Sequence, residues 1–419
     1  MTETKTIRLY DEQVMLRSCK TVVTACRELK KGFGVELSET VFYPEGGGQL
    51  SDTGKLILAD KSVVVTHVRE KDGTIYHETA EPIAVGTEVT AEIDWQMRFD
   101  HMQQHCGEHL LSYGFWKFCQ ADNVGFHMTE EMVTIDLNRE VSAAEVQQVE
   151  TLANAQIQEN LPVKTTWMDA EQAAICATRK FNDKLTGPVR VVSIEGSDAC
   201  TCCGTHPPMT GMIGLVKIFK MEKHKDGTRI YFLCGRRAMA KIQKCWQALN
   251  GASQLLSLKD EEIEQGVERL QAEKKELQDK LTAAEERWVN EIAPQLLEKA
   301  ELKEDIKFVE IRFEDISADA ARKLAQRLAE DPQAQVTLFY KQKNRLNYIL
   351  ARGTSVPHSC RERIAVLNKK LNGHGGGNDM MTAGKDMFQQ IGWNIDNLAI
   401  GPEIRRGDAF LASLFAFLR

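Results

Sequence analysis

Two short motifs rich in metal-binding side chains constrain the fold of this chain most. Their sequences are HCGEH at residues 105–109 and CTCCGTH at residues 200–206. On a helix, residues four apart lie on one face, so His105 and His109 can reach one ion. Cys202 and His206 have a similar, ligand-like spacing. Because zinc accepts thiolate sulfur and imidazole nitrogen together, we predict that the fold brings both motifs around one Zn2+ ion.

The spacing alone leaves the choice of ligands open. His101 lies one helical turn before His105, so either of two histidine pairs could bind the ion. Cys200 or Cys203 could replace Cys202 on chemical grounds. The alternative without a metal is a set of reduced, buried cysteines with histidines at the surface, since a free cysteine is often a small apolar residue.

The composition is that of a globular protein in a reducing compartment. The 419 residues are 42% hydrophobic and 27% charged, which excludes wholesale disorder, and the net charge of -7 argues against a uniformly basic nucleic-acid coat. Because the eleven cysteines are odd in number and the polar start resembles no signal peptide, we expect free thiols in the cytoplasm. No apolar stretch is long enough for a membrane span, and the closest, 409–418, is predicted to be a buried or partner-facing helix end.

The pattern of elements predicts an α+β chain of several modules. Short segments rich in Val, Ile and Thr predict a β-barrel-like module over residues 1–95. Residues 96–250 mix helical and strand patterns in an α/β core, in which 99–117 is predicted to be a helix. A compact α/β module is predicted over 305–395, and an apolar tail follows over 396–419.

Between these modules, residues 251–304 are predicted to form a helical arm. Apolar residues recur every seven positions from Leu256 to Ala284, which is a broken coiled-coil pattern and predicts one helix from about 255 to 298. The arm has 8 Lys or Arg against 14 Asp or Glu, so its net charge is -6. The helix either packs on its own chain or serves as a dimerising or spacer arm.

Two glycine-rich motifs could approach a ligand closely. The first is TVFYPEGGGQ at residues 40–49, and the second is GHGGGN at residues 373–378. Glycine permits positive φ and a close backbone approach, and backbone amides in such runs can cradle a phosphate. The first motif is not a phosphate-binding P-loop, because no Gly-Lys-Ser/Thr follows it. The alternatives are a flexible turn for the first motif and a linker for the second.

A local excess of positive charge follows the second metal motif. Residues 207–250 contain 9 Lys or Arg, including Arg236 and Arg237, against 2 acidic residues, so this stretch is +7. A solvated face is the simplest interpretation of a charge run. Its position directly after the metal motif favours a footprint for a polyanion such as nucleic acid.

Four motifs in this order resemble a known family. They are TVFYPEGGGQLSDTG at 40–54, MQQHCGEHLLS at 102–112, CCGTH at 202–206 and CGRRA at 234–238. Together they resemble the editing module of alanyl-tRNA synthetase and the freestanding AlaX-type alanyl-tRNA editing proteins. Residues 305–395 resemble the DHH-associated C-terminal domain found beside that module. Because no segment resembles the ATP-binding aminoacylation core, the resemblance implies a deacylase that acts in trans.

The resemblance also implies which residues form the site. It assigns the metal ligands to His105, His109, Cys202 and His206. It places Thr40, Gly46, Gly47, Gly48 and Gln49 near the aminoacyl group. It assigns tRNA contacts to Arg236, Arg237, His374, Gly375, Gly376 and Gly377. One position departs from the pattern, because Glu108 stands where many relatives have Gln.

The implied reaction is hydrolysis of serine, or of glycine, esterified to the tRNA for alanine. We expect Glu108 either to assist proton transfer or to orient a ligand histidine. Thr40 is the expected hydrogen-bond partner of a serine hydroxyl, since such a partner would be left unpaired by alanine. The expected partner is misacylated tRNA, with no membrane, and a homodimer could form through the helical arm or the C-terminal module.

Two other functions compete with this hypothesis. Taken alone, residues 105–109 match the H-x-x-E-H pattern of inverted zinc metallopeptidases. That alternative leaves Cys202, His206, both glycine motifs and the basic stretch unexplained, and it requires a distal carboxylate ligand. The third possibility is a non-catalytic RNA-binding protein with structural zinc.

Overall fold

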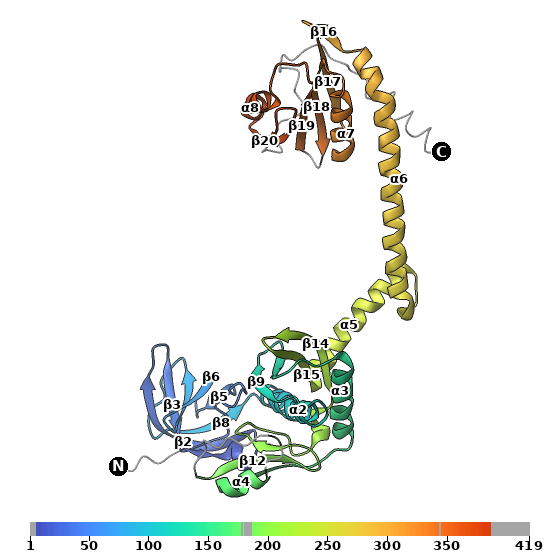
Figure 1. Cartoon of the computed structure of the whole chain (residues 1–419). Helices are drawn as coiled ribbons and strands as arrows, with labels where there is room; N and C mark the ends of the chain where they lie inside the picture. Colours follow the sequence, from blue (N-terminus) through green and yellow to red (C-terminus); the bar gives the residue numbers. More distant parts are fainter. Residues whose placement is uncertain (1–5, 177–178, 180–186, 343–344, 387–419) are drawn as a thin grey trace. The chain divides into compact units, whose positions relative to one another are not determined.

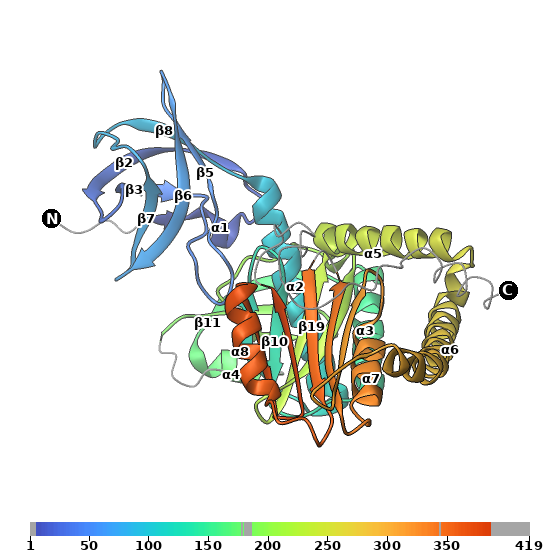
Figure 2. The same ribbon diagram turned by 90° about the horizontal axis from the view of Figure 1, so that it is seen from above.

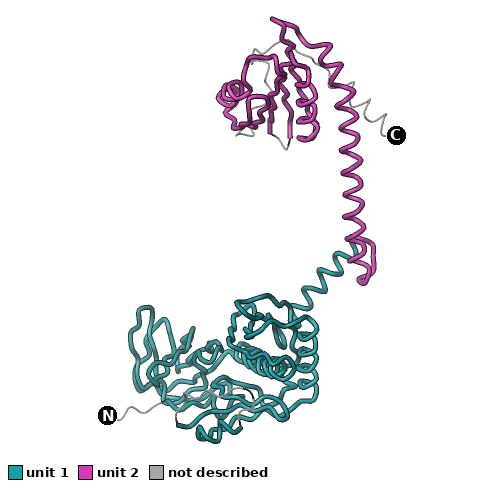
Figure 3. Tube along the Cα trace, viewed as in Figure 1, with its two compact units in different colours: residues 1–254 teal, residues 255–419 magenta. Residues whose placement is uncertain are grey.

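The fold was analysed in a computed structural model, which describes residues 6–176, 179, 187–342 and 345–386. The chain forms two compact units, residues 1–254 and 255–419 (Figure 3). Helices and strands are mixed in both units, as the predicted α+β class requires (Figure 1). The apolar tail predicted over 396–419 lies outside the described residues. Among the described helices, none combines the length and apolar character that a membrane crossing needs.

A closed barrel of six strands forms the start of the first unit (Figure 2). Around the barrel, the strands are β2 (Ser18–Glu28), β3 (Phe33–Leu37), β7 (Thr74–Thr79), β6 (Ser62–Lys71), β5 (Gly54–Ile57) and β8 (Glu88–Ile93). Along β6 and β7, buried and more exposed residues alternate, because successive side chains of a strand point to opposite faces. The inward residues, such as Val35, Leu56 and Val65, form one apolar core. The short elements β1 (Ile7–Arg8), α1 (Leu9–Glu12) and β4 (Glu39–Thr40) precede or connect these strands.

Helix α2 (Trp95–Cys119) is the central element of the first unit and carries the first metal motif. It begins where Asp94 accepts a hydrogen bond from the Met97 amide, and it ends at Gln120 in a left-handed conformation with φ of 50°. Most of the helix is buried on all sides, so its polar side chains must find partners within the protein.

Two sheets and further helices surround α2. One sheet has the order β14 (Val216–His224), β15 (Gly227–Cys234), β10 (Val133–Leu137) and β9 (Asn123–Met128). The other has the order β11 (Val163–Met168), β12 (Val189–Ile194) and β13 (Ala199–Thr201). The remaining elements are α3 (Ala143–Gln158), α4 (Ala170–Cys176) and the 3-10 turn η1 (Thr210–Ile213). Residue Cys202 follows the short strand β13, which therefore positions the second metal motif.

A buried ion pair joins α2 to the segment that carries the first glycine motif. Arg98 Nε donates to Asp52 Oδ1 over 2.9 Å, and Arg98 Nη2 donates to the carbonyl oxygen of Val41 over 2.7 Å. Both charged side chains are fully buried. Removing either partner would leave an unpaired charge in the interior, so the pair fixes the glycine segment against the helix that carries His105.

The prediction of one helix over residues 255–298 was wrong. Helix α5 (Gly235–Leu256) starts much earlier, and α6 (Ile263–Glu298) follows after a break that contains the 3-10 turn η2 (Asp260–Glu262). Ser257 has a positive φ of 53°, a conformation that a helix cannot continue. The heptad repeat continues across this break. The spacing of apolar residues cannot predict that one residue, Ser257, takes a left-handed conformation. Whether the arm forms a dimer stays a prediction.

The second unit contains one sheet of six strands. Its order is β16 (Glu301–Lys303), β17 (Ile306–Phe313), β18 (Ala334–Gln342), β19 (Arg345–Arg352), β21 (Met381–Asp386) and β20 (Gly373–Gly377). Helix α7 (Ala318–Leu328) and helix α8 (Cys360–Lys370) contribute to two separate apolar clusters. Leu338 belongs to the cluster of α7 and its neighbour Phe339 to the cluster of α8, so the alternation along β18 places the two clusters on opposite faces of the sheet.

The second glycine motif is a strand rather than a phosphate-binding loop. Residues 373–377 form the edge strand β20, which pairs antiparallel with β21. Packing explains Gly373, because a Cβ atom there would lie 2.4 Å from the hydroxyl oxygen of Tyr348. Gly384, on the paired strand β21, is needed for the same reason, since its Cβ atom would lie 2.4 Å from the ring of Tyr348. The backbone of residues 373–377 is therefore extended and not the linker given as the alternative, and a contact of His374 to Gly377 with tRNA stays a prediction.

Candidate metal centre

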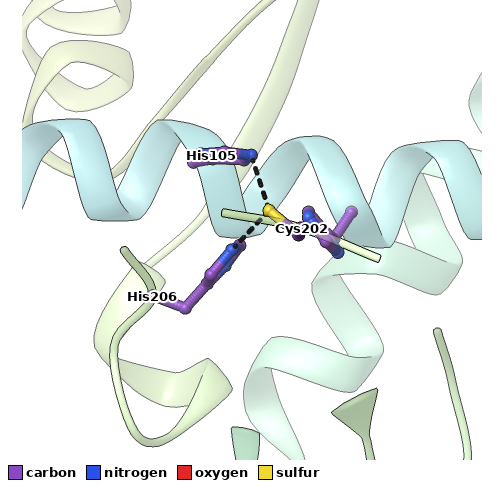
Figure 4. A group of neighbouring side chains, drawn as sticks. His105, Cys202 and His206 are labelled. Carbon is purple, nitrogen blue, oxygen red and sulfur yellow. Dashed lines mark hydrogen bonds between the residues drawn. The ribbon is translucent and has the colours of Figure 1, made fainter. Parts of the chain in front are cut away.

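Four potential ligand side chains meet inside the first unit. His105 and His109 from α2 lie beside Cys202 and His206, and one ligand atom of each lies within 4.8 Å of those of the other three. Cys202 Sγ is 3.4 Å from His105 Nε2 and 3.4 Å from His206 Nε2 (Figure 4). The fold thus brings together two segments that are far apart in the sequence, as the two motifs predict.

The geometry and chemistry of this cluster fit a tetrahedral metal ion. Ligand atoms about 2.0–2.3 Å from an ion at tetrahedral angles lie roughly 3.4–3.7 Å from one another, which matches the two measured separations of 3.4 Å. Three of the four residues are buried, and His206 Nδ1 is a buried nitrogen without a hydrogen-bond partner among the described residues. Three imidazoles and one thiolate form a donor set of the kind that zinc prefers.

The protonation states of Cys202 and His206 also suit metal binding. Loss of contact with water would raise the pKa of the Cys202 thiol, but the imidazoles of His105 and His206 hold that pKa well below its ordinary value. Burial lowers the pKa of His206 to about 3, which keeps this imidazole neutral. A thiolate and a neutral imidazole are the forms that bind a metal ion. Burial would lower the pKa of His109, but Cys200 and the hydrogen bond with Asp198 raise it, so a metal ion would have to displace a proton there.

Gln49, from the end of the first glycine motif, orients the ligand His105. Its side-chain oxygen accepts hydrogen bonds from His105 Nδ1 and from the Thr205 amide, both over 2.9 Å. Its side-chain nitrogen donates to Thr205 Oγ1 over 2.8 Å. Because Nδ1 of His105 is held in this way, Nε2 is the nitrogen that can bind a metal ion. Gln49 therefore contacts both metal motifs, although it lies in a third segment of the sequence.

Asp198 orients the ligand His109 in the same manner. Asp198 Oδ2 lies 2.9 Å from His109 Nδ1, and Asp198 Oδ1 accepts a hydrogen bond from Arg179 Nε over 2.9 Å. Burial would raise the pKa of Asp198, but the hydrogen bond with His109 and the charge of Arg179 hold it well below its ordinary value. Neither Asp198 nor Arg179 was predicted from the sequence. A carboxylate four positions before Cys202 was the available signal that Asp198 could orient a ligand.

The alternative ligands left open by the spacing are now placed. Cys200 Sγ is 3.6 Å from His109 Nδ1, the nitrogen that faces Asp198, and these three residues form a second potential ligand group. Burial raises the pKa of the Cys200 thiol, which disfavours its thiolate. His101 is buried but belongs to neither group in the described part of the chain. All eleven cysteines are free thiols, as predicted.

Arg190 fixes the loop that carries Cys202, and the sequence analysis also missed it. The side chain is nearly buried on β12, and Nη1 donates to the carbonyl oxygens of Cys202 and Gly204, both over 2.8 Å. A charged residue within the otherwise apolar run VRVVSI was the available signal. The loop is also tight around the ligands, because a Cβ atom on Gly204 would lie 2.1 Å from the ring of His105.

The first glycine motif forms a tight turn between two walls of the site. Gly47 and Gly48 have φ of 58° and 80°, in the region that favours glycine. A Cβ atom on Gly47 would lie 2.6 Å from Cys203 Sγ, and one on Gly48 would lie 2.5 Å from the ring of Phe126. Gly46 closes the turn by pairing with Gln49. The turn therefore places Gln49 next to His105 and needs glycine for both conformation and space.

A pocket of about 400 Å3 opens beside the ligands. It is lined by Gly47, Gly48, His105, Glu108, His109, Asn123, Val124, Gly125, Phe126, Arg179, Cys200, Thr201, Cys202 and Cys203. The lining combines backbone of the glycine turn, an apolar wall from β9 and several polar side chains. Such a mixture suits a small polar ligand that must be oriented.

Glu108 projects into this pocket from α2. Its Oε1 accepts hydrogen bonds from the hydroxyl of Ser112 and, over 2.7 Å, from Asn123 Nδ2. Its Oε2 lies 3.8 Å from His109 Nε2, which is too long for a hydrogen bond. Glu108 therefore does not hold the ligand histidine in place, and Oε2 is the atom through which it can act on a substrate.

Thr40 is not brought to the pocket. It is fully buried, its Oγ1 lies 2.8 Å from His77 Nε2, and it accepts a hydrogen bond from the Phe42 amide over 3.1 Å. His77 Nδ1 lies 2.9 Å from the carbonyl oxygen of Val35, to which only a protonated nitrogen can donate. The Thr40 hydroxyl must then donate to His77 and has no second hydrogen for a serine side chain.

Several members of the basic stretch already have partners. Arg237 Nε donates to Asp100 Oδ2 over 2.7 Å and Nη1 donates to the Thr129 carbonyl oxygen over 2.6 Å, which ties α5 to α2 and to the turn before β10. Arg236 is exposed on α5. The two neighbouring arginines are thus placed differently, and of the two only Arg236 presents its charge at the surface.

Family models match two segments of the chain. Residues 2–97 match the model described as tRNA synthetases class II (A). Residues 189–231 match the model described as threonyl and alanyl tRNA synthetase second additional domain, and this segment includes Cys202 and His206. In this chain the first segment contains the six-stranded barrel and the second contains the loop that supplies half of the ligand cluster.

Curated relatives cover the chain more fully. The alanyl-tRNA editing protein AlaX-L of Pyrococcus horikoshii is 30% identical over 392 residues, which are 90% of this chain and 94% of that protein. The alanyl-tRNA editing protein Aarsd1-B of Xenopus laevis is 35% identical over 257 residues, which are 59% of this chain and 60% of that protein. An alanine–tRNA ligase of Pyrococcus furiosus is 30% identical over 84% of this chain, which spans only 39% of that enzyme.

Among solved structures, a domain of a synthetase was matched over part of the chain. The C-Ala domain of the Aquifex aeolicus alanyl-tRNA synthetase aligns with 21% of this chain and 82% of that chain, at 22% identity and a TM-score of 0.20. The match to the Pyrococcus horikoshii protein, by contrast, extends over nearly the whole chain, and both family models are those of tRNA synthetases. The chain belongs to the family of AlaX-type alanyl-tRNA editing proteins.

Proposed function

We propose that this chain is an aminoacyl-tRNA deacylase that hydrolyses mischarged tRNA for alanine in trans, with zinc bound by His105, His109, Cys202 and His206. The observation that carries the proposal is the position of the four-ligand cluster in the wall of a pocket large enough for a small aminoacyl ester. Relatives that this chain matches over most of its length are named alanyl-tRNA editing proteins.

The chemistry requires a polarised ester and a held substrate. When bound, zinc would polarise the ester carbonyl or lower the pKa of a water molecule. The protein orients the two histidines of α2 through their Nδ1 atoms: Gln49 contacts His105 Nδ1, and Asp198 contacts His109 Nδ1. The turn at Gly47 and Gly48 lines the pocket with backbone, which leaves space for the acyl group.

Selectivity for serine over alanine is expected if a polar group of the pocket is left without a hydrogen-bond partner when alanine is bound. A pocket that hydrogen-bonds a hydroxyl disfavours an analogue without one, because its own polar group then loses a partner. Thr40 is engaged elsewhere, and Asn123 already donates to Glu108 and Ser112. We therefore assign this contact to the hydroxyl of Thr201, which also lines the pocket. Glycine would be admitted by size and discriminated less.

The tRNA would be bound outside the pocket by positive charge. Arg236 is exposed near the start of α5, and Lys241 and Lys244 follow on the same exposed helix. Such charges bind phosphates and make affinity dependent on salt. The second unit, with its exposed residues at His374 to Gly376, is the proposed second contact with the tRNA body, and the arm formed by α6 is the proposed site of dimerisation.

Deacylation assays test this function directly. The full chain is incubated with seryl-, glycyl- and alanyl-tRNA for alanine, with and without a chelator. We expect seryl and glycyl esters to be hydrolysed faster than the alanyl ester, loss of activity on chelation and recovery with zinc. Cys202→Ser should lose both zinc and activity, whereas Cys245→Ser, at an exposed position on α5, serves as the matched control. Turnover that is indifferent to metal removal would contradict the proposal.

The same assays address the competing functions. A metallopeptidase with the H-x-x-E-H pattern would cleave peptides, and a non-catalytic RNA-binding protein would bind tRNA without releasing the amino acid. Neither alternative is favoured, because a peptidase of that class does not explain the cluster with Cys202 and His206, and a purely structural ion needs no pocket beside it.

A further inference from the structure

Glu108 is the one carboxylate among the described residues that line the pocket. It is nearly buried, with 5% of its surface exposed. The other charged side chain of the lining, Arg179, is already paired with Asp198. Within the described chain no lysine or arginine forms an ion pair with Glu108, and Arg179, whose charge the Glu108 carboxylate attracts, is held by Asp198. A buried carboxylate is stable only with a cation or donors around it.

The two carboxylate oxygens of Glu108 have different partners: Oε1 accepts hydrogen bonds from the protein, and Oε2 accepts none from the residues that the structure describes. Asn123 Nδ2 donates both to Glu108 Oε1, over 2.7 Å, and to Ser112 Oγ, over 2.9 Å. Ser112 then uses its own hydrogen for Glu108 Oε1. Oε1 is fixed by two donors from the protein, and the carboxylate group cannot rotate without breaking them. Oε2 is left on the side of His109 Nε2, where its only ion-pair contact within the described chain is 3.8 Å long.

This placement suits a cation that arrives with the substrate. An aminoacyl ester has a protonated α-amine two bonds from the carbonyl carbon that is to be attacked. His109 is one of the proposed ligands, so an ester positioned for hydrolysis at the metal centre carries its amine into the neighbourhood of Oε2. A hydrogen bond between two charged groups in a pocket is stronger than one between neutral groups.

Resting on the proposed function, we propose that Glu108 Oε2 binds the α-ammonium group of the aminoacyl ester and so restricts the site to esters with a free amine. This role replaces the general base expected from the sequence. It also differs from the orienting role, because Asp198 and Gln49 already hold the two histidines of α2. The substrate class is then narrower than any acylated tRNA: acyl groups that lack the amine are rejected.

The test uses two non-hydrolysable analogues of the tRNA 3′ end joined by an amide. One carries serine, and the other carries 3-hydroxypropionate, which is serine without its amine and therefore adds no bulk. We expect the wild-type chain to bind the seryl analogue about 10- to 100-fold more tightly, as for a charge-assisted hydrogen bond. Glu108→Gln should remove most of this preference by weakening the seryl analogue alone. Glu131→Gln, an exposed glutamate before β10, is the matched control and should retain the preference.

Hydrolysis of the corresponding esters separates this role from a base. With an ammonium anchor, Glu108→Gln raises KM for the seryl ester and leaves the rate on the 3-hydroxypropionyl ester near that of the wild type. With a general base, kcat falls equally on both esters, and the proposal is overturned. Equal binding of the two analogues by the wild-type chain also overturns it, whatever the variant does. If the wild-type chain hydrolyses neither ester, the deacylase function itself fails, which is a distinct outcome.

Discussion

The chain contains two glycine-rich segments that have similar amino-acid sequences and different backbone structures. In the first unit, Gly47 and Gly48 form a turn with positive φ between Cys203 and Phe126, beside the ligand cluster. In the second unit, residues 373–377 form the edge strand β20, paired with β21. The comparison teaches that the role of a glycine run is decided by what lies opposite it, a cysteine and an aromatic ring in one case and Tyr348 in the other.

The largest expected effect comes from filling the turn at the pocket. Gly48→Ala places a Cβ atom 2.5 Å from the Phe126 ring at a φ of 80°, so the turn must move and carry Gln49 with it. A shift of about 1 Å near a reacting group can lower turnover about 100-fold. Measuring kcat/KM for seryl-tRNA together with zinc content checks this. A variant with near-normal turnover would show that the turn does not position the site.

A smaller effect is expected at the residue that the turn positions. Gln49→Ala removes the acceptor of His105 Nδ1 and both contacts with Thr205, so the ligand loses its fixed orientation. Loss of such a supporting contact lowers metal affinity about 10- to 100-fold. Competition with a zinc-binding dye measures the affinity, and Gln147→Ala at an exposed position on α3 is the control. Unchanged affinity would mean that Gln49 acts only on the substrate.

The glycines of the second unit should affect stability rather than the metal centre. Gly384→Ala on β21 forces a Cβ atom to within 2.4 Å of the Tyr348 ring. Overpacking of this kind costs about 1–3 kcal/mol. Urea unfolding should show a lower midpoint, while zinc content and affinity stay those of the wild type. If zinc content falls as well, the two glycine segments are not independent.

The smallest effect on stability is expected at a glycine of the second unit that has space for a side chain, Gly376. A Cβ atom on Gly376 meets no heavy atom within 4 Å, and its φ is not in the left-handed region. Gly376→Ala should therefore change the free energy of unfolding by less than about 0.5 kcal/mol. Equilibrium unfolding beside the wild type measures the difference. A destabilisation as large as that of Gly384→Ala would contradict the view that only particular glycines of this unit are needed for packing.

The four candidate metal ligands could be predicted from the sequence, because residue types and their spacing indicate metal binding. The pair on α2 and the pair at Cys202 and His206 follow from helical periodicity and the affinity of zinc for nitrogen and sulfur, and the structure brings them together. The supporting residues could not be found in this way. Asp198 acts on His109, which lies in a distant segment, and Arg190 acts on backbone carbonyl oxygens. The local signals of these two residues, a carboxylate before Cys202 and a charge within VRVVSI, do not identify those partners.

The fold shows the same division. Helix α2 covers the helix predicted over 99–117, and the six strands of the barrel lie within the β module predicted over 1–95, because helical spacing and β-branched residues are local signals. The break after α5 and the strand β20 were missed. The break depends on the positive φ of Ser257, and β20 depends on pairing with β21, neither of which composition reveals. The predicted division into five modules is finer than the two compact units and stays a prediction.

The central claim is that four side chains from two distant segments hold one metal ion. Elemental analysis of the purified full chain tests it most directly, alongside His109→Ala, Cys202→Ser and the control Cys245→Ser. The account predicts close to one zinc per chain in the wild type and the control, and almost none in the other two variants. A wild-type chain without a bound metal, or variants of His109 and Cys202 that keep their zinc, would contradict it.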